Sequence, residues 1–188
     1  MTATFPSLAG HFLIAMPLMT DPNFADSVVY LLTHDEQGSL GVIINRPSGL
    51  TLADVLEQLQ PENLGFNESG KQDVFVGGPV QSELGFVLHN SGPQFQGTMN
   101  FGALSLTSSQ DALSAIAHDQ GPAQHLIILG HAGWGAGQLE AELRDNAWLS
   151  CPADLEIIFN TPIEQRRKAA AALLGVDLER LSHQVGHA

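Results

Sequence analysis

The feature that most constrains the fold is a series of short apolar runs separated by Pro, Gly, Asp and Asn. Each run has the length of a strand and is rich in Val, Ile and Leu. Most runs are continuously apolar rather than alternating, which is typical of strands covered on both faces. The predicted strands are His11–Ala15, Val28–Thr33, Val42–Asn45, Val74–Val76, Phe86–Leu88, Leu126–Leu129 and Leu155–Phe159.

Capping residues and helical spacing predict four helices between these runs. The first follows Thr51 and ends before Pro61, and four of its apolar residues share one face: Leu52, Val55, Leu56 and Leu59. The second follows Ser108 and runs to about His118, with Asp111 at the reciprocal capping position.

The third helix starts near Gly137, and its Glu140 and Arg144 are spaced to form a weak surface pair. The fourth opens at Thr161 and ends at Gly175, a glycine suited to a helix C-terminus. Residues 60–72 and 89–103 are predicted to be long loops. Strands dominate the first half, and helices alternate with strands in the second, which favours an α+β fold in one domain over residues 1–188.

The charge balance argues against nucleic-acid binding. The chain has 7 Lys and Arg against 20 Asp and Glu, whereas phosphate backbones are bound mainly through cations. The densest basic site is Arg166-Arg167-Lys168, which we interpret as a solvated helical face. Cys151 is the single cysteine, so no internal disulfide can form, and we expect a cytoplasmic protein. No apolar run approaches membrane-spanning length, so no membrane partner is expected.

A glycine-dense segment, Gly130 to Gly137, is the most motif-like part of the chain. A predicted strand, a turn over Gly133-Trp-Gly-Ala-Gly137 and a helix from Gln138 would direct backbone N–H groups toward an anion. Gln138 stands where a dinucleotide motif needs its third glycine, and Ala132 stands where a nucleophile elbow needs serine. Two interpretations stay open: tight packing around Trp134, or a cradle for an anion or small ligand.

No catalytic or metal-binding pattern is present in the sequence. The eight histidines include no set of three or four at ligand spacing, so we expect no metal site and no cofactor. Cys151, which precedes Pro152, is interpreted as a small apolar filler. We expect a protein that is not an enzyme.

Arg46 is the most notable lone charge, because it lies between an apolar run and Pro47 in a chain with few cations. We expect an ion pair with Asp21 or Asp26, and the alternative is an arginine that clamps a ligand. The candidate binding surface comprises Arg46, Asp21, Gly130, His131, Gly133, Trp134, Gly135 and Gly137.

Several blocks, in order and nearly end to end, resemble the YqgE/AlgH family of bacterial proteins. The blocks are Gly10-His-Phe-Leu-Ile-Ala-Met-Pro17, Asp21-Pro-Asn-Phe24, Ser27-Val-Val-Tyr30, Gly41-Val-Ile-Ile-Asn-Arg-Pro47, Val76-Gly-Gly-Pro79, Gly85-Phe-Val-Leu-His89, Leu129-Gly-His-Ala-Gly-Trp-Gly-Ala-Gly-Gln-Leu-Glu140, Asn146-Ala-Trp-Leu149 and Gly186-His-Ala188. The chain departs from the pattern at Leu84, His131 and Arg167, where relatives often carry Arg, Tyr and Trp.

The resemblance implies a mixed α+β fold in which a bifurcated sheet curls into a pseudo-barrel, with about four flanking helices. It also implies the label of transcriptional regulator, which describes a pathway effect and assigns no molecular activity or catalytic residue. Our favoured hypothesis is a non-enzymatic protein that acts through a protein partner, with an indirect effect on transcription. The alternative is a binder of small anionic ligands, or an enzyme, that uses the Gly130–Gly137 turn and Arg46.

Overall fold

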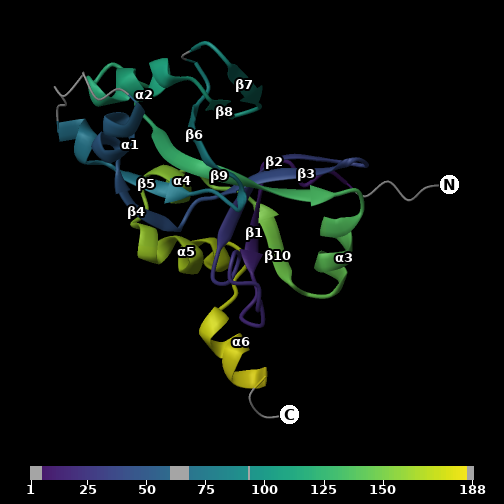
Figure 1. Cartoon of the computed structure of the whole chain (residues 1–188). Coiled ribbons are helices and arrows are strands. Elements are labelled where there is room, and N and C mark those ends of the chain that lie inside the picture. The colour runs from purple at the N-terminus through teal and green to yellow at the C-terminus, as the bar shows by residue number, and fades with distance from the viewer. Residues whose placement is uncertain (1–5, 60–67, 93, 186–188) are drawn as a thin grey trace. The chain divides into compact units, whose positions relative to one another are not determined.

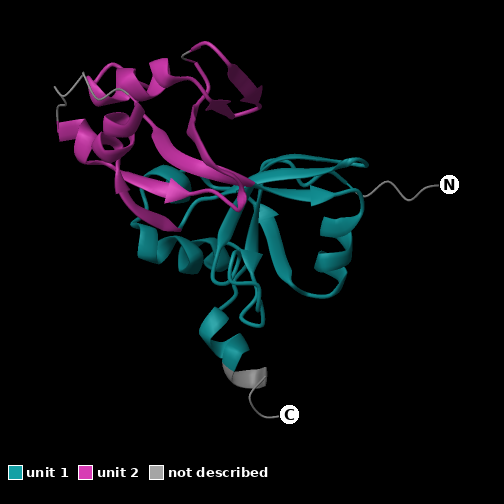
Figure 2. Cartoon of the chain, viewed as in Figure 1, with its two compact units in different colours: residues 1–45, 132–188 teal, residues 46–131 magenta. Residues whose placement is uncertain are grey.

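The chain divides into two compact units, each of which mixes strands and helices. The structure is a computed structural model that describes residues 6–59, 68–92 and 94–185. Unit 1 comprises residues 1–45 and 132–188, and unit 2 comprises residues 46–131 (Figure 2). Unit 1 is therefore assembled from two separate stretches of sequence, whereas unit 2 is continuous. A single domain over residues 1–188 stays a prediction.

Unit 1 contains an antiparallel sheet with the strand order β10–β1–β2–β3–β9 (Figure 1). Its strands are β1 (His11–Ala15), β2 (Val28–Asp35), β3 (Gly38–Ile43), the last four residues of β9 (His125–Gly135) and β10 (Trp148–Pro152). Leu13 lies opposite Val29 on one side and Ser150 on the other. Residues 12–15 and 28–32 are all buried, as the continuous apolar runs predict.

The helices of unit 1 follow β9 and β10 in the sequence. They are α3 (Gln138–Arg144), α4 (Leu155–Phe159), the 3-10 turn η2 (Ile163–Gln165), α5 (Arg166–Ala172) and α6 (Leu178–Val185). Gly175 has φ +69°, a left-handed conformation that suits a glycine after a helix, so the predicted end of the fourth helix is confirmed.

The strand predicted at Leu155–Phe159 is wrong, because these residues form α4. Asp154 precedes them, and its side chain accepts the N–H of Glu156 at 3.0 Å, which caps the helix. Ile157 and Ile158 are buried, so the run is apolar as predicted. A run of five residues, four of them apolar, is too short to show whether the period is helical or extended, and Asp154 was the informative signal.

Unit 2 contains a mixed sheet with the strand order β4–β5–β9–β6–β8–β7. Its strands are β4 (Pro47–Thr51), β5 (Asp73–Val76), the first seven residues of β9, β6 (Val80–Asn90), β8 (Leu104–Thr107) and β7 (Thr98–Phe101). Only β5 and β9 pair in parallel in the described sheet. The predicted loop 89–103 is therefore wrong over the end of β6 and over β7, whereas residues 60–67 of the other predicted loop lie outside the described residues.

Two helices, α1 (Leu52–Leu59) and α2 (Gln110–Ala117), pack on the sheet of unit 2, and the 3-10 turn η1 (Glu68–Lys71) precedes β5. The core contains residues from both helices and from β5, β6 and β9: Leu52, Val55, Leu56, Val74, Val87, Ala112, Leu113, Ile116, Ala117 and Ile127. Leu59, predicted on the buried face of α1, is 46% exposed because it is the last residue of the helix.

The caps of these two helices differ from one another. Thr51 and Asp54 form a reciprocal capping box, in which each side chain accepts the other residue's N–H. These bonds lower the pKa of the Asp54 carboxyl. In α2 the cap is Ser109 rather than the predicted Ser108, and its side chain makes no capping hydrogen bond. The predicted reciprocal role of Asp111 is thus wrong.

The mixed α+β fold with a curled, largely antiparallel sheet is confirmed. The described residues contain six α-helices, of which α4 and α6 were not predicted. Among these residues no helix is long and apolar enough to cross a lipid bilayer.

Candidate functional site

The residues of the predicted binding surface are divided between the two units. Unit 2 holds Arg46, Gly130 and His131, whereas unit 1 holds Asp21, Gly133, Trp134, Gly135 and Gly137. Their convergence on one binding surface stays a prediction.

Gly130 is required by close backbone contact within unit 2. Its φ is +73°, and a Cβ atom placed there would lie 2.5 Å from the carbonyl oxygen of Gly78 and 3.0 Å from that of Val80. Real Cβ atoms do not approach backbone oxygens so closely, so only glycine fits. This supports the packing interpretation at the start of the glycine-dense segment.

The turn predicted at Gly133–Gly137 is wrong over its first half, because β9 continues to Gly135 and pairs with β3. Gly38 lies opposite Gly135, and its own Cβ position would be 2.3 Å from the carbonyl oxygen of Trp134. The N–H of Gly135 donates to Gln138 Oε1 at 3.0 Å. Gly137, with φ +74°, then turns the chain into α3. One N–H that an anion cradle would offer is therefore already bonded within the protein.

Trp134 belongs to an aromatic cluster that is held by a carboxylate. Its indole Nε1 donates to Glu142 Oε2 at 3.0 Å, and Trp148 Nε1 donates to the same oxygen at 2.8 Å. Phe24 contacts both indole rings, with ring centroids 5.9 Å and 5.6 Å away. Gln138 Nε2 donates to the other Glu142 oxygen at 3.1 Å. Glu142 thus joins β9, α3 and β10, and both tryptophans are buried.

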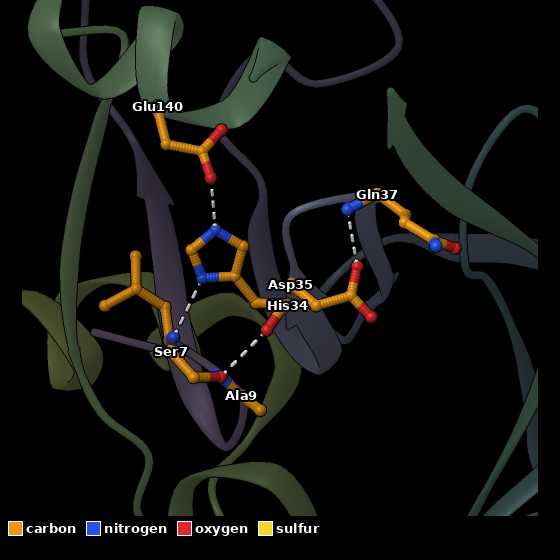
Figure 3. A network of polar contacts seen from close by, with 7 residues as sticks. Ser7, Ala9, His34, Asp35, Gln37 and Glu140 are labelled. Carbon is orange, nitrogen blue, oxygen red and sulfur yellow. Dashed lines mark hydrogen bonds and ion pairs between the residues drawn. The ribbon is translucent and has the colours of Figure 1, made fainter. Parts of the chain in front are cut away.

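A buried histidine–carboxylate pair lies in the same unit, between His34 on β2 and Glu140 on α3 (Figure 3). His34 Nε2 is 2.6 Å from Glu140 Oε1, and the N–H of Leu8 donates to His34 Nδ1 at 2.9 Å. Because Nδ1 accepts a backbone hydrogen, the ring proton is on Nε2 and is donated to the carboxylate. This hydrogen bond lowers the pKa of Glu140.

The geometry of this pair favours a structural role. In a catalytic dyad one ring nitrogen binds the carboxylate and the other faces the nucleophile. Here the second nitrogen is occupied by the main chain, and the hydroxyl of Ser7 donates to the carbonyl oxygen of His34 rather than to the ring (Figure 3). Through these two hydrogen bonds, His34 connects the segment before β1 with α3. The sequence analysis paired Glu140 with Arg144, so it missed this contact between residues 106 positions apart.

The solvated basic face predicted at Arg166-Arg167-Lys168 is wrong for two of its three residues. Arg166 is 6% exposed; its Nε donates to the carbonyl oxygen of Thr161 at 2.9 Å, and its Nη1 donates to that of Ile44. Removal from water lowers the pKa of this guanidinium. Arg167 is partly buried and donates to the carbonyl oxygen of Ala15 at 2.7 Å. Both arginines donate to main-chain carbonyl oxygens inside unit 1. Of the three basic residues, Lys168 alone is exposed to solvent as predicted.

The side chains of the remaining candidate residues contact other residues of their own unit. His131 Nε2 lies 3.1 Å from Gln81 Oε1, and its ring meets Phe86 edge to face. The carboxylate of Asp21 accepts the N–H of Asn23 at 2.9 Å, which closes a turn. Asp26, the other acid proposed for Arg46, faces Arg167 at 3.4 Å. The ion pair predicted for Arg46 stays a prediction.

Neither the single cysteine nor the metal-ligating residue types form a reactive site in the described residues. Cys151 is buried, and burial raises the pKa of its thiol, so it is not poised as a thiolate. Among the described residues, no group of three or more His, Cys, Asp and Glu could hold a metal ion.

Unit 2 carries an open apolar groove of about 310 Å³, which we call the β6 groove. Its apolar wall consists of Leu50, Val55, Leu59, Leu84, Leu113 and Leu129. Its polar and small lining residues are Gln58, Ser82, Glu83, Gly85, Ser108 and Gln110. Two of these lining leucines, Leu59 and Leu84, are 46% and 48% exposed. Sequence reasoning noted Leu84 only as a departure from a family pattern and missed the groove, because its walls come from four separate segments.

Comparisons with known proteins give consistent results. A family model described as AlgH-like matches residues 12–179. A UPF0301 protein of Stutzerimonas stutzeri is 58% identical over the full length of both chains. The UPF0301 protein AlgH of Pseudomonas aeruginosa is 59% identical over 181 residues, which cover 96% of each chain.

Solved structures agree with these matches. The solution structure of the AlgH protein from Pseudomonas aeruginosa superimposes with a TM-score of 0.81 at 57% identity and covers all of both chains. A crystal structure of a protein from Corynebacterium diphtheriae superimposes with a TM-score of 0.60 at 22% identity, covering 83% of this chain and 81% of the other, which supports the fold alone.

Proposed function

The chain belongs to the AlgH-like family, and on that premise we propose that it is a non-enzymatic, cytoplasmic protein that acts by binding a protein partner. In this proposal any effect on transcription is indirect, because the partner rather than this chain would contact nucleic acid. The observation that carries the proposal is the β6 groove, whose exposed leucines offer apolar surface for burial.

The polar groups of unit 1 support the non-enzymatic part of the proposal. The side chains best suited to acid–base chemistry, His34, Glu140 and Glu142, are bonded to one another, to indole N–H groups or to the main chain. A general base needs a free position that faces the proton it removes. These groups stabilise unit 1 through internal hydrogen bonds.

The charge distribution supports a protein rather than a nucleic-acid partner. Unit 2 has two basic residues, Arg46 and Lys71, against eight acidic ones. Such a surface repels phosphate backbones and attracts basic protein segments.

Affinity capture from a cell lysate, followed by mass spectrometry, tests the proposal. The tagged full-length chain should retain a reproducible protein that also binds after purification and after nuclease treatment. Retention that disappears with nuclease, or a protein that fails to bind once purified, would refute it.

The anionic-ligand alternative is tested separately by a thermal-shift screen of anionic metabolites. A ligand at 100 times its dissociation constant stabilises a protein by about 2.7 kcal/mol. Loss of that stabilisation on Arg46→Gln substitution would support the alternative, whereas an unchanged melting temperature across the screen would argue against it.

A further inference from the structure

Helices α5 and α6 follow one another at the C-terminal end of unit 1 (Figure 1), and an open cavity of about 250 Å³ lies where they meet. We call it the α5–α6 cavity. Gly175, with φ +69°, turns the chain after α5, and the N–H of Val176 donates to the carbonyl oxygen of Ala171 at 3.1 Å. Because of this turn, residues 176–179 line the same cavity as residues of η2 and α5.

The least exposed residues that line this cavity are apolar. Ala171 and Leu178 are buried, and Val176 is partly buried. They form an apolar floor that a short aliphatic group can cover. The volume of the cavity is below about 300 Å³, the lower end of ordinary ligand pockets, so it suits a molecule smaller than a nucleotide.

Two cations of α5, Arg167 and Lys168, line the cavity. Arg167 Nη2 donates to the carbonyl oxygen of Ala15 at 2.7 Å, and Nη1 faces Asp26 at 3.4 Å, so the guanidinium is held in place. Its Nε is buried and has no hydrogen-bond partner in the described residues. The exposed Lys168 forms no ion pair with any described residue. Both cations therefore have donor capacity that the chain does not use.

Three carboxylates line the same cavity: Glu164 from η2, and Asp177 and Glu179 from the start of α6. Asp177 is engaged within the chain, since its carboxylate accepts the N–H of Glu179 at 3.0 Å and faces Arg180 at 3.6 Å. The carboxylates of Glu164 and Glu179 form no ion pair with any residue that the structure describes. These two carboxylates are thus available to a cationic group.

Opposite charges lie side by side on one face of the helical segment formed by η2 and α5. Glu164, Arg167 and Lys168 are spaced i, i+3 and i+4, so they are neighbours on that face. An α-amino acid also carries opposite charges side by side, because its ammonium and carboxylate groups are attached to the same carbon atom. It can therefore satisfy both kinds of charge at once, whereas a simple anion would be repelled by the three carboxylates.

We propose that the α5–α6 cavity binds a free α-amino acid with a short aliphatic side chain. The carboxylate of the ligand contacts Arg167 and Lys168, its ammonium group contacts Glu164, and its side chain covers Ala171 and Leu178. The cavity lies wholly in unit 1, whereas the β6 groove lies in unit 2. This inference therefore goes beyond the proposed function and does not depend on it.

Titration of the isotope-labelled full-length chain with L-valine, L-leucine or L-isoleucine, followed by two-dimensional NMR, tests the proposal. At least one of the three should shift the amide signals of residues 164–179 until they saturate. No saturable shift in the low millimolar range, or shifts confined to unit 2, would overturn the proposal.

Two analogues of the best-bound amino acid test the pairing of charges. The carboxamide lacks the carboxylate, and the N-acetyl derivative lacks the ammonium group. Each should bind about tenfold more weakly than the free amino acid, because one charge-assisted contact is lost. An N-acetyl derivative that binds as tightly as the free amino acid would show that the site takes a plain anion and that the assigned ligand class is wrong.

Matched variants locate the site. Lys168→Gln should weaken binding about fivefold, because an exposed charge pair contributes little, and it removes no ion pair of the chain. Arg167→Gln should weaken binding about tenfold or more, with far-ultraviolet circular dichroism to confirm that the variant is folded without its bond to Ala15. Arg144→Gln is the control, since it removes an exposed cation of unit 1 that does not line the cavity. Equal affinities of Lys168→Gln and Arg144→Gln would contradict the assignment.

Discussion

In unit 1 charged and aromatic side chains join segments that are far apart in sequence, whereas the core cluster of unit 2 is aliphatic. Glu142 bonds two tryptophans, Glu140 bonds His34, and Arg166 bonds a carbonyl oxygen 122 residues away. Exposed leucines occur in both units: Leu59 and Leu84 in unit 2, and Leu18, Leu173 and Leu174 in unit 1. We conclude that unit 1 uses its polar groups for internal stability, whereas unit 2 is held mainly by aliphatic packing and carries a groove lined by leucines.

Substitutions in the aromatic cluster of unit 1 test the contrast between the two units most strongly. Trp148→Ala removes a buried ring and should lower the free energy of unfolding by about 4 kcal/mol, as measured by urea denaturation. Trp148→Phe keeps most of the volume and loses the hydrogen bond to Glu142, so it should cost about 1–2 kcal/mol. Equal losses in the two variants would show that packing contributes little at this position.

Substitution of Glu142, whose carboxylate binds both indole N–H groups of the cluster, should have the next largest effect on the free energy of unfolding. Glu142→Gln keeps the side-chain shape but removes the charge that strengthens two indole hydrogen bonds, and we expect a loss of about 1–2 kcal/mol. Because the chain contains only two tryptophans, its fluorescence reports this cluster alone. An unchanged emission maximum would contradict the assigned contacts.

The Glu140–His34 pair should give a pH-dependent effect. Its hydrogen bond lowers the pKa of Glu140 from the ordinary value of 4.5, so its contribution is present above pH 4.5 and is lost as the pH falls through the folded pKa. Glu140→Gln should therefore cost about 1 kcal/mol at pH 7 and progressively less in acid. Urea denaturation across this pH range measures the difference, with Glu36→Gln as the exposed control.

The smallest effect is expected in the β6 groove. Leu84→Ser should change the free energy of unfolding by no more than about 0.5 kcal/mol, because the side chain is half exposed and contributes little to the core. Leu52→Ala, in the buried core of the same unit, should cost about 2–5 kcal/mol. A large loss in Leu84→Ser would mean that the groove is part of the core, which would weaken the contrast between the units.

Signals carried by a few neighbouring residues predicted the helices and strands well, but they did not predict the contacts between distant segments. The strand at His11–Ala15 and the start of α1 after Thr51 were both predicted, because apolar runs and capping residues act over a few positions. The continuation of β9 through Gly133 to Gly135 was not, since it depends on pairing with Gly38, almost a hundred residues earlier. In this pairing the close approach of the two strands requires Gly38, whereas Gly133 and Gly135 have room for a Cβ atom.

The candidate site was less predictable than the fold for the same reason. Packing around Trp134 was one of two interpretations of the glycine-dense segment, but its partners Phe24, Glu142 and Trp148 come from separate segments and have no shared spacing. Arg166 was expected in solvent because two further basic residues follow it, yet the carbonyl oxygens it satisfies are visible only in three dimensions. Polar contacts between residues far apart in the chain cannot be predicted from short sequence patterns.

The division of unit 1 into two stretches has a consequence for synthesis on the ribosome. Strands β1 to β3 emerge first, but the strands that cover their two outer edges, β10 and β9, follow only after the 86 residues of unit 2. At about 5–20 residues per second, this interval lasts roughly 4–17 s. During that time an apolar three-stranded meander has both edges open, and such edges pair readily with other chains. The nascent chain thus has its greatest need of chaperones before its first unit can close.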